Sequence, residues 1–166
     1  MPKNTTYIGR QSRFKHQNLD KKYDFLAIVS GPEPQRTIFE KGIIKALQKR
    51  KEQSLIVLGK TELNDTKEIG AITIKSHLNA KDLNHAILQS DLIICRSGYS
   101  TIMDLEKLGK KAFLIPTPGQ TEQEYLAKFL SEYGQKREHL SEGRIFDLFE
   151  NFLSIFECLV HVNVYI

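Results

Sequence analysis

Short apolar runs alternate along this chain with longer amphipathic stretches. Runs without a polar face predict strands buried on both sides of a parallel sheet. The predicted strands are Asp24–Val29, Leu55–Leu58, Ala71–Ile74, Asp91–Cys95 and Lys111–Ile115, with a further short strand at Thr6–Ile8. The amphipathic stretches between them predict helices. This order predicts an α/β fold, a Rossmann-like parallel sheet with helices on both faces.

Apolar stripes and terminal residues define the predicted helices. The first helix runs from Gln35 to about Lys49, and its buried residues are Ile38, Ile43 or Ile44, and Leu47. The second helix is capped by Asn79 or Asp82 and ends at about Gln89. Its buried residues are Leu83, Ala86 and Ile87. A third is capped by Ser97 or Ser100, buries Ile102, Leu105 and Leu108, and ends at Gly109; a fourth spans Glu122–Glu132, with Tyr125, Leu126 and Phe129 on one face. The last predicted helix is Arg144–Glu157, and polar Thr61–Gly70 is predicted as a loop.

Composition divides the chain into three segments. Residues 1–22 are polar and basic and form a linker with a first strand segment, residues 23–143 form the α/β domain, and residues 144–166 form an amphipathic helix and an apolar tail. The composition of the linker alone favours a solvated segment. The tail, Cys158–Ile166, is compatible with a final strand, a partner contact or a membrane-facing edge.

Bulk properties restrict the class of protein. The 166 residues, 40% of them hydrophobic, form one domain with a sizeable core. The net charge of +4 suits a chain that binds a diphosphate or sits near anionic lipid, and it equally suits an ordinary lysine-rich surface. Basic and aromatic residues are not interleaved, so no nucleic-acid partner is expected. Cys95 lies in a buried strand pattern typical of a structural thiol. Without a signal peptide or apolar span, the expected location is cytoplasmic.

Asp91–Glu124 contains two consecutive strand–loop–helix units. Gly98, after the first strand, tolerates unusual backbone conformations and lets a ligand approach closely. In open α/β sheets, ligands bind beyond the carboxyl ends of the strands, and the helix N-termini there suit phosphate. The pattern therefore predicts a nucleotide- or phosphate-binding domain.

The residues of this stretch carry a family resemblance. The ordered set Cys95-Arg96-Ser97-Gly98, Thr101, Asp104, Gly109, Pro116 and Glu122-Gln123 resembles the donor-sugar signature of GT-B glycosyltransferases, and most closely the C-terminal domain of glycosyltransferase family 28. The likeness extends from about Tyr7 to Tyr133. That family includes the bacterial lipid II-forming N-acetylglucosaminyltransferase and the small catalytic subunit of the two-chain dolichol-linked GlcNAc transferase.

The resemblance implies a set of site residues. The diphosphate would be bound by Arg13, Ser30, Gly31, Ser97, Gly98 and Tyr99, the uracil by Leu78, Asn79 and Ala80, the ribose by Asp104, and the sugar by Glu122, Gln123 and Glu124. Two features depart from the family pattern. Pro32 and Pro34 stand in the first loop where small residues are usual, and proline offers no N–H to phosphate. Asp104 stands where glutamate is typical.

Other interpretations of these residues stay open. Asp104 suits an exposed helix aspartate, Glu122–Glu124 a charged helix start, and Glu33 a carboxylate that stabilises the following helix. His77 suits a structural histidine at a strand end as well as a general base.

The resemblance implies that the chain is the donor-binding half of an inverting hexosyltransferase, which moves N-acetylglucosamine from UDP to a hydroxyl acceptor. No cofactor or metal is implied. The catalytic base and the acceptor site would lie on an acceptor domain, either a separate chain or a missing N-terminal domain, through which the protein would reach a membrane surface. The SGPEPQRT loop favours derivation from the bacterial single-chain type. Two alternatives remain, a UDP-GlcNAc epimerase-like half and a non-catalytic UDP-sugar-binding module.

Overall fold

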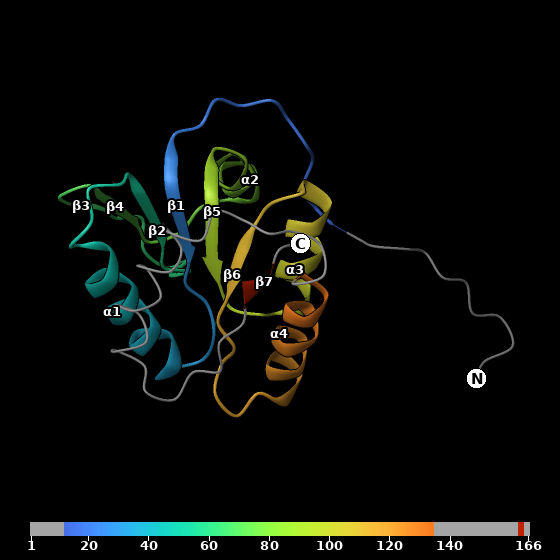
Figure 1. Cartoon of the computed structure of the whole chain (residues 1–166). Coiled ribbons are helices and arrows are strands. Elements are labelled where there is room, and N and C mark those ends of the chain that lie inside the picture. Colours follow the sequence, from blue (N-terminus) through green and yellow to red (C-terminus); the bar gives the residue numbers. More distant parts are fainter. Residues whose placement is uncertain (1–11, 135–162, 165–166) are drawn as a thin grey trace, which may run out of the picture.

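A seven-stranded sheet forms the centre of the molecule. The computed structural model describes residues 12–134 and 163–164, and the strand order is β3-β4-β2-β1-β5-β6-β7 (Figure 1). The strands are β1 (Tyr23–Ile28), β2 (Ser54–Val57), β3 (Thr66–Ile69), β4 (Ile72–Lys75), β5 (Ser90–Cys95), β6 (Ala112–Leu114) and β7 (Asn163–Val164). Strands β4, β2, β1, β5 and β6 are parallel, and β3 and β7 add antiparallel edges.

Helices cover both faces of this sheet, as predicted. They are α1 (Gln35–Leu47), α2 (Ala80–Leu88), α3 (Tyr99–Leu108) and α4 (Thr121–Gly134). Alternate strand residues point to opposite faces. Phe25 and Ala27 therefore pack with α1 in one apolar cluster, whereas Leu26 packs with α2, α3 and Ala127 of α4 in the other. The second face carries three helices, and two of them, α3 and α4, begin near the carboxyl ends of β5 and β6 (Figure 1).

The polar segment Thr61–Gly70 is not wholly a loop. Its last part forms β3, which pairs antiparallel with β4 from Thr66↔Lys75 to Ile69↔Ile72. The prediction was wrong because an edge strand is held by backbone hydrogen bonds and needs no apolar face. Gly70, at φ +59°, makes the tight turn between the two strands.

Two predicted helix faces also need correction. Ile38 is 44% exposed, and the buried stripe of α1 runs instead through Phe39, Ile43 and Leu47. Spacings of four residues keep these side chains on one helix face, and Ile38 is turned away from it. In α4, Tyr125 and Phe129 are exposed and stack at 5.9 Å, whereas Leu126 packs against the core.

The described part of the N-terminal linker is anchored to the domain. Phe14 is 4% exposed and belongs to the cluster on the three-helix face. The Asn84 side-chain amide donates to the Lys15 carbonyl at 2.9 Å, which fixes the linker against α2. Phe14 therefore departs from the solvated linker that the composition favoured, whereas Lys15–Lys22 are exposed, as a solvated segment would be. The predicted strand Thr6–Ile8 and the predicted helix Arg144–Glu157 lie outside the described residues; of the apolar tail, Asn163–Val164 pairs with β6.

Candidate functional site

The loops that follow the parallel strands meet at one edge of the sheet. Gly31, in the β1–α1 loop, has φ +114°, and a Cβ placed there would lie 3.8 Å from Thr117 Oγ1 of the β6–α4 loop. Side chains rarely adopt such a backbone conformation, so the position favours glycine. The two loops therefore lie close together.

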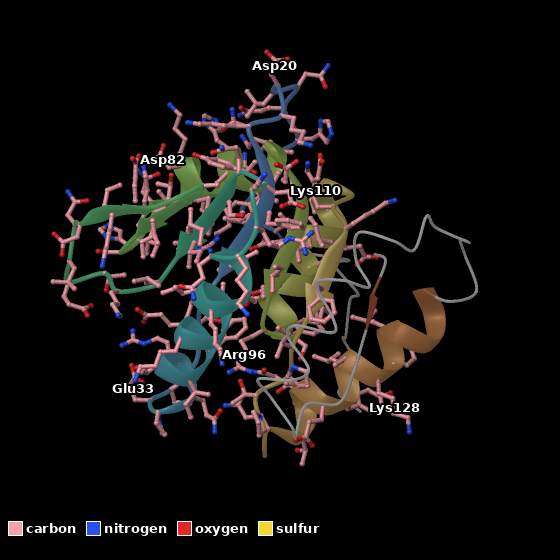
Figure 2. The ribbon with its side chains drawn as sticks, turned by 60° about the vertical axis from the view of Figure 1, so that its left-hand side comes forward. Asp20, Glu33, Asp82, Arg96, Lys110 and Lys128 are labelled. Atoms are coloured by element: carbon pink, nitrogen blue, oxygen red, sulfur yellow. The ribbon has the colours of Figure 1, made fainter. Side chains whose placement is uncertain are left out.

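The buried Arg96 side chain connects these two loops through hydrogen bonds. Its Nη1 donates to the Pro116 carbonyl at 2.8 Å, its Nη2 donates to the Gln35 carbonyl at 3.1 Å, and its guanidinium lies 4.4 Å from the centre of the Phe39 ring. The side chain lies at the same end of the molecule as Glu33 and far from Asp20 (Figure 2). Burial lowers the pKa of Arg96 to about 10, which still leaves the guanidinium charged at neutral pH.

None of the described carboxylates pairs with Arg96, so its positive charge is not neutralised by the part of the chain that the structure describes. Sequence reasoning quoted this arginine as part of the motif and missed its role. The available signal was a cation directly after a buried strand, where a side chain needs partners from neighbouring loops.

Helix α3 begins beside these loops without a cap. Its N-cap is Gly98, with no side-chain hydrogen bond and no acidic residue in the first turn. The predicted cap by Ser97 or Ser100 is therefore wrong. Ser97 is fully buried, and its hydroxyl donates to the Gln123 carbonyl at 2.8 Å. Gly98 has φ −76°, an ordinary value, so its proposed conformational role is also wrong; its Cβ position is open space.

The other helix N-termini that the structure describes are provided with oxygen acceptors or acidic residues. The Asn79 side chain accepts from the Asp82 N–H at 2.9 Å at the start of α2, and Glu33 accepts from the Thr37 N–H at 3.2 Å at the start of α1. Helix α4 has Glu122 and Glu124 in its first turn. The N–H groups of α3 and the positive end of its dipole therefore remain available to an anion.

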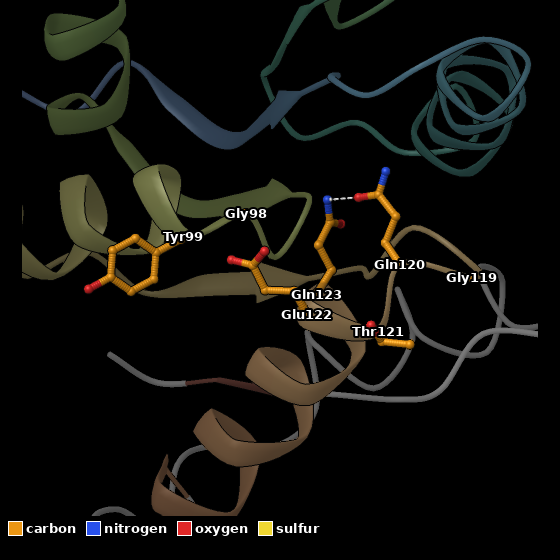
Figure 3. Close-up of a pocket in the computed structure, with 7 residues that line it drawn as sticks. All are labelled: Gly98, Tyr99, Gly119, Gln120, Thr121, Glu122 and Gln123. Carbon is orange, nitrogen blue, oxygen red and sulfur yellow. Dashed lines mark hydrogen bonds between the residues drawn. The ribbon is translucent and has the colours of Figure 1, made fainter. Parts of the chain in front are cut away.

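Two hollows flank the N-terminus of α3 and share Tyr99, whose side chain is 60% exposed. The first, of about 400 Å³, is lined by Gly98, Tyr99, Gly119, Gln120, Thr121, Glu122 and Gln123 (Figure 3). The second, of about 550 Å³, is lined by Ser12, Arg13, Tyr99, Ser100, Met103 and Asp104. The structure thus gathers Gly98, Tyr99, Glu122 and Gln123 on one side of the helix end and Arg13 and Asp104 on the other.

Asp104 is a buried residue with two partners from the linker. It is 7% exposed, which excludes the interpretation as an exposed helix aspartate. The Ser12 hydroxyl donates to Oδ1 at 2.6 Å, and Arg13 Nε lies 3.7 Å from Oδ2. The guanidinium of Arg13 lies 4.9 Å from the centre of the Phe14 ring. Two predicted site residues far apart in sequence, Arg13 and Asp104, therefore lie side by side, but the contributions of Ser12 and Phe14 were not predicted.

Gln123 is engaged at both ends of its side-chain amide. Its Oε1 accepts from the Thr117 N–H at 3.0 Å, and its Nε2 donates to Gln120 Oε1 at 2.5 Å (Figure 3). Glu124 accepts from the Gly119 N–H at 2.9 Å. These two side chains therefore hold the β6–α4 loop, and Gln120, which sequence reasoning did not select, becomes part of the hollow.

The remaining predicted residues line neither hollow. Ser30 and Gly31 are exposed in the β1–α1 loop, Leu78 packs against the core, and Asn79 and Ala80 begin α2. They lie after carboxyl ends of parallel strands, at the same edge of the sheet as the hollows.

Three other groups have structural explanations. Hydrogen bonds from Thr37 and Arg36 lower the pKa of Glu33, which supports the helix-stabilising interpretation. His77 Nδ1 lies 2.7 Å from the Leu63 carbonyl and is hydrogen-bonded to it. Burial raises the pKa of the Cys95 thiol to about 12, so it stays neutral, as expected of a structural thiol.

Comparison with known proteins shows the family of this chain. Residues 35–157 match the glycosyltransferase family 28 C-terminal domain. Three relatives share the name UDP-N-acetylglucosamine--N-acetylmuramyl-(pentapeptide) pyrophosphoryl-undecaprenol N-acetylglucosamine transferase. The protein of Exiguobacterium sibiricum is 31% identical over 144 residues, covering 76% of this chain and 40% of the relative. That of Alkaliphilus oremlandii is 33% identical over 99 residues, covering 55% and 27%.

The protein of Desulforudis audaxviator is 53% identical over 47 residues, covering 27% of this chain and 13% of the relative. The chain thus spans between 13% and 40% of the length of these three relatives.

Proposed function

Because the chain belongs to the glycosyltransferase family 28 C-terminal domain family, we propose that it is the donor-binding half of an inverting hexosyltransferase. In this proposal it binds UDP-GlcNAc, and the sugar is transferred to a hydroxyl of an acceptor held by another domain. The relatives carry the name of a UDP-N-acetylglucosamine-dependent transferase, which supports the choice of donor. The chain spans at most 40% of those relatives, which supports a role as one half of a catalytic unit.

The observation that carries the proposal is the uncapped N-terminus of α3 between two hollows. A diphosphate there would accept hydrogen bonds from the first-turn N–H groups and would face the positive end of the helix dipole. The ribose would extend toward Asp104 in the second hollow, and the hexose would lie in the first. Uracil would bind at Leu78–Ala80, where the backbone precedes α2.

Two arginines support stabilisation of the leaving UDP. Arg13 is 63% exposed in its side chain and lines the second hollow, where it can reach phosphate oxygens. Arg96 contributes a buried positive charge beneath the loops, without a described carboxylate to cancel it. Fixed positive charge of this kind lowers the barrier to departure of an anionic leaving group. The catalytic base would come from the acceptor domain, and we propose that no metal or cofactor takes part.

We propose a cytoplasmic location, with contact to a membrane surface made through the acceptor domain. No helix among the described residues combines the length and the apolar character required to span a bilayer.

Titration calorimetry tests the donor site. The full chain is titrated with UDP, UDP-GlcNAc and GDP in the presence of EDTA, and we expect UDP and UDP-GlcNAc to bind and GDP to bind far more weakly. Ser100→Asp places a carboxylate in the first turn of α3 and should weaken UDP at least about tenfold, since like charges at a helix N-terminus repel. Asn18→Asp is the control, because it adds the same negative charge at an exposed position of the linker that lines neither hollow.

Absence of UDP binding, or equal losses in the two variants, would contradict the site. Turnover is then assayed with a lipid-linked acceptor, with and without an added acceptor domain. Consumption of UDP-GlcNAc without any acceptor would favour the epimerase alternative over transfer.

A further inference from the structure

We propose that Gln120 binds the hexose of the donor, by presenting both N–H groups of its side-chain amide to an oxygen of the sugar. This inference rests on the proposed function, because it assigns a role within the donor site. The residue lines the hollow of about 400 Å³ beside α3 and lies in the β6–α4 loop, between Gly119 and the first residue of α4.

The orientation of Gln120 follows from a chain of hydrogen bonds that begins at a group of fixed polarity. A backbone N–H can only donate, so the atom of Gln123 that lies 3.0 Å from the Thr117 nitrogen is the amide oxygen. The other end of Gln123 is then its NH₂ group, which can only donate. Its neighbour in Gln120 at 2.5 Å must be the amide oxygen. The NH₂ group of Gln120 is therefore the end that points away from Gln123 (Figure 3).

The backbone of Gln120 is fixed on both sides. Its N–H donates to the Thr117 carbonyl at 3.0 Å, and its carbonyl accepts from the Glu124 N–H at 3.1 Å. With the main chain held and the side-chain oxygen bonded, little conformational freedom is left to lose when a ligand binds. The amide is thus preorganised, and its NH₂ group has no hydrogen-bond partner among the described residues.

The chemistry of the hollow matches a hexose. Gln120 offers two donors, the Glu122 carboxylate offers acceptors, and the Thr121 hydroxyl can serve as either. A hexose presents hydroxyl groups that donate and accept, and an N-acetyl sugar adds a carbonyl oxygen that only accepts. The NH₂ group of Gln120 requires an oxygen with a free lone pair. A sugar that covers this group and leaves it unpaired would be disfavoured, because a donor shielded from water without a partner is costly.

The test compares the affinities of the full chain for UDP and for UDP-GlcNAc by calorimetry. The wild-type chain should bind UDP-GlcNAc more tightly than UDP. Gln120→Met keeps the length of the side chain and removes both donors, so it should lower that preference about 5- to 10-fold and leave UDP affinity within about twofold. Gln120→Glu, which replaces the donors by acceptors, should lower the preference at least as much.

Gln53→Met is the control, since Gln53 comes just before β2 and therefore lies at the amino-terminal end of the parallel strands, opposite the hollows. If both Gln120 variants bind UDP normally and keep the wild-type preference for UDP-GlcNAc over UDP, the proposed role of Gln120 is wrong, while the donor site stands. Equal binding of UDP and UDP-GlcNAc by the wild-type chain would do the same. A wild-type chain that does not bind UDP at all would overturn the proposed function itself. Thermal melts of each variant establish that a lost preference does not reflect unfolding.

Discussion

Asp104 offers the sharpest test of the proposed binding of a nucleotide in the second hollow. In the structure its carboxylate is buried, with Ser12 bonded to one oxygen and Arg13 near the other. A carboxylate has about four lone-pair positions, so it can accept from a ribose hydroxyl in addition to Ser12. Asp104→Asn preserves the shape and an oxygen for Ser12, but it removes the charge.

The expected loss follows from the kind of bond removed. A hydrogen bond to a charged group contributes about 1.5–3 kcal/mol, so UDP affinity should fall about 10- to 150-fold in Asp104→Asn. A general loss could also arise from the linker, since Asp104 holds Ser12 and Arg13. Comparison with 2′-deoxy-UDP separates the two explanations. It lacks one ribose hydroxyl, so the wild-type chain should prefer UDP over it and Asp104→Asn should show little preference.

Both ligands are titrated into both proteins, which gives a complete cycle. Ser12→Ala is the matched control, because it removes the linker bond to Asp104 and keeps the carboxylate; it should retain the preference for UDP. If Asp104→Asn weakens UDP and 2′-deoxy-UDP by the same factor, the carboxylate does not contact that ribose hydroxyl and serves to position the linker.

Three further predictions test other parts of the structure. Phe14→Ala should lower the free energy of unfolding by about 3–5 kcal/mol in urea denaturation, because a buried ring leaves a cavity; a loss below about 1 kcal/mol would show that the linker is not part of the core. Gly98→Ala should change stability by less than about 1 kcal/mol, because the site has ordinary φ and open space, yet it should weaken UDP at least about tenfold by filling the approach to α3; unchanged binding would refute close approach. The buried Cys95 thiol has a pKa of about 12, above its value of about 8.5 in an unfolded chain, so the folded state retains this proton and stability is lost as pH rises from about 8.5 toward 12. Urea midpoints should therefore decline more steeply above pH 8.5 in the wild type than in Cys95→Ala. Parallel declines in the two proteins would show that the Cys95 thiol does not cause the loss of stability.

Much of the fold could be predicted from local pattern. The central strands were predicted to within two residues because a run such as Leu55–Leu58 has no polar face and must be buried on both sides. Gly109 was correctly predicted to end α3, where it adopts φ +62°. The sequence failed at β3, which depends on backbone pairing with β4, and at Ile38, where the choice between adjacent apolar residues is made by the packing of α1 on the sheet.

The site could be predicted only in part. The family resemblance selected Arg13 and Asp104, 91 positions apart, and the structure brings them together. It could not select Ser12, whose bond to Asp104 depends on how the linker folds back over α3. Nor could it give the direction of the Gln123 amide, which is determined by the backbone N–H of Thr117 in a neighbouring turn. Residue types are encoded locally, but the polarity of their hydrogen bonds depends on tertiary partners.

Under the proposed function, the anchoring of Phe14 has a consequence for the order in which the substrates bind. Arg13 precedes a ring buried in the core, so this arginine travels with the donor half. Closure of the two halves of a transferase would bring an acceptor to a nucleotide that Arg13 already binds. The nucleotide sugar could therefore load before the second substrate arrives, and its residence time on this half would not depend on the closing motion.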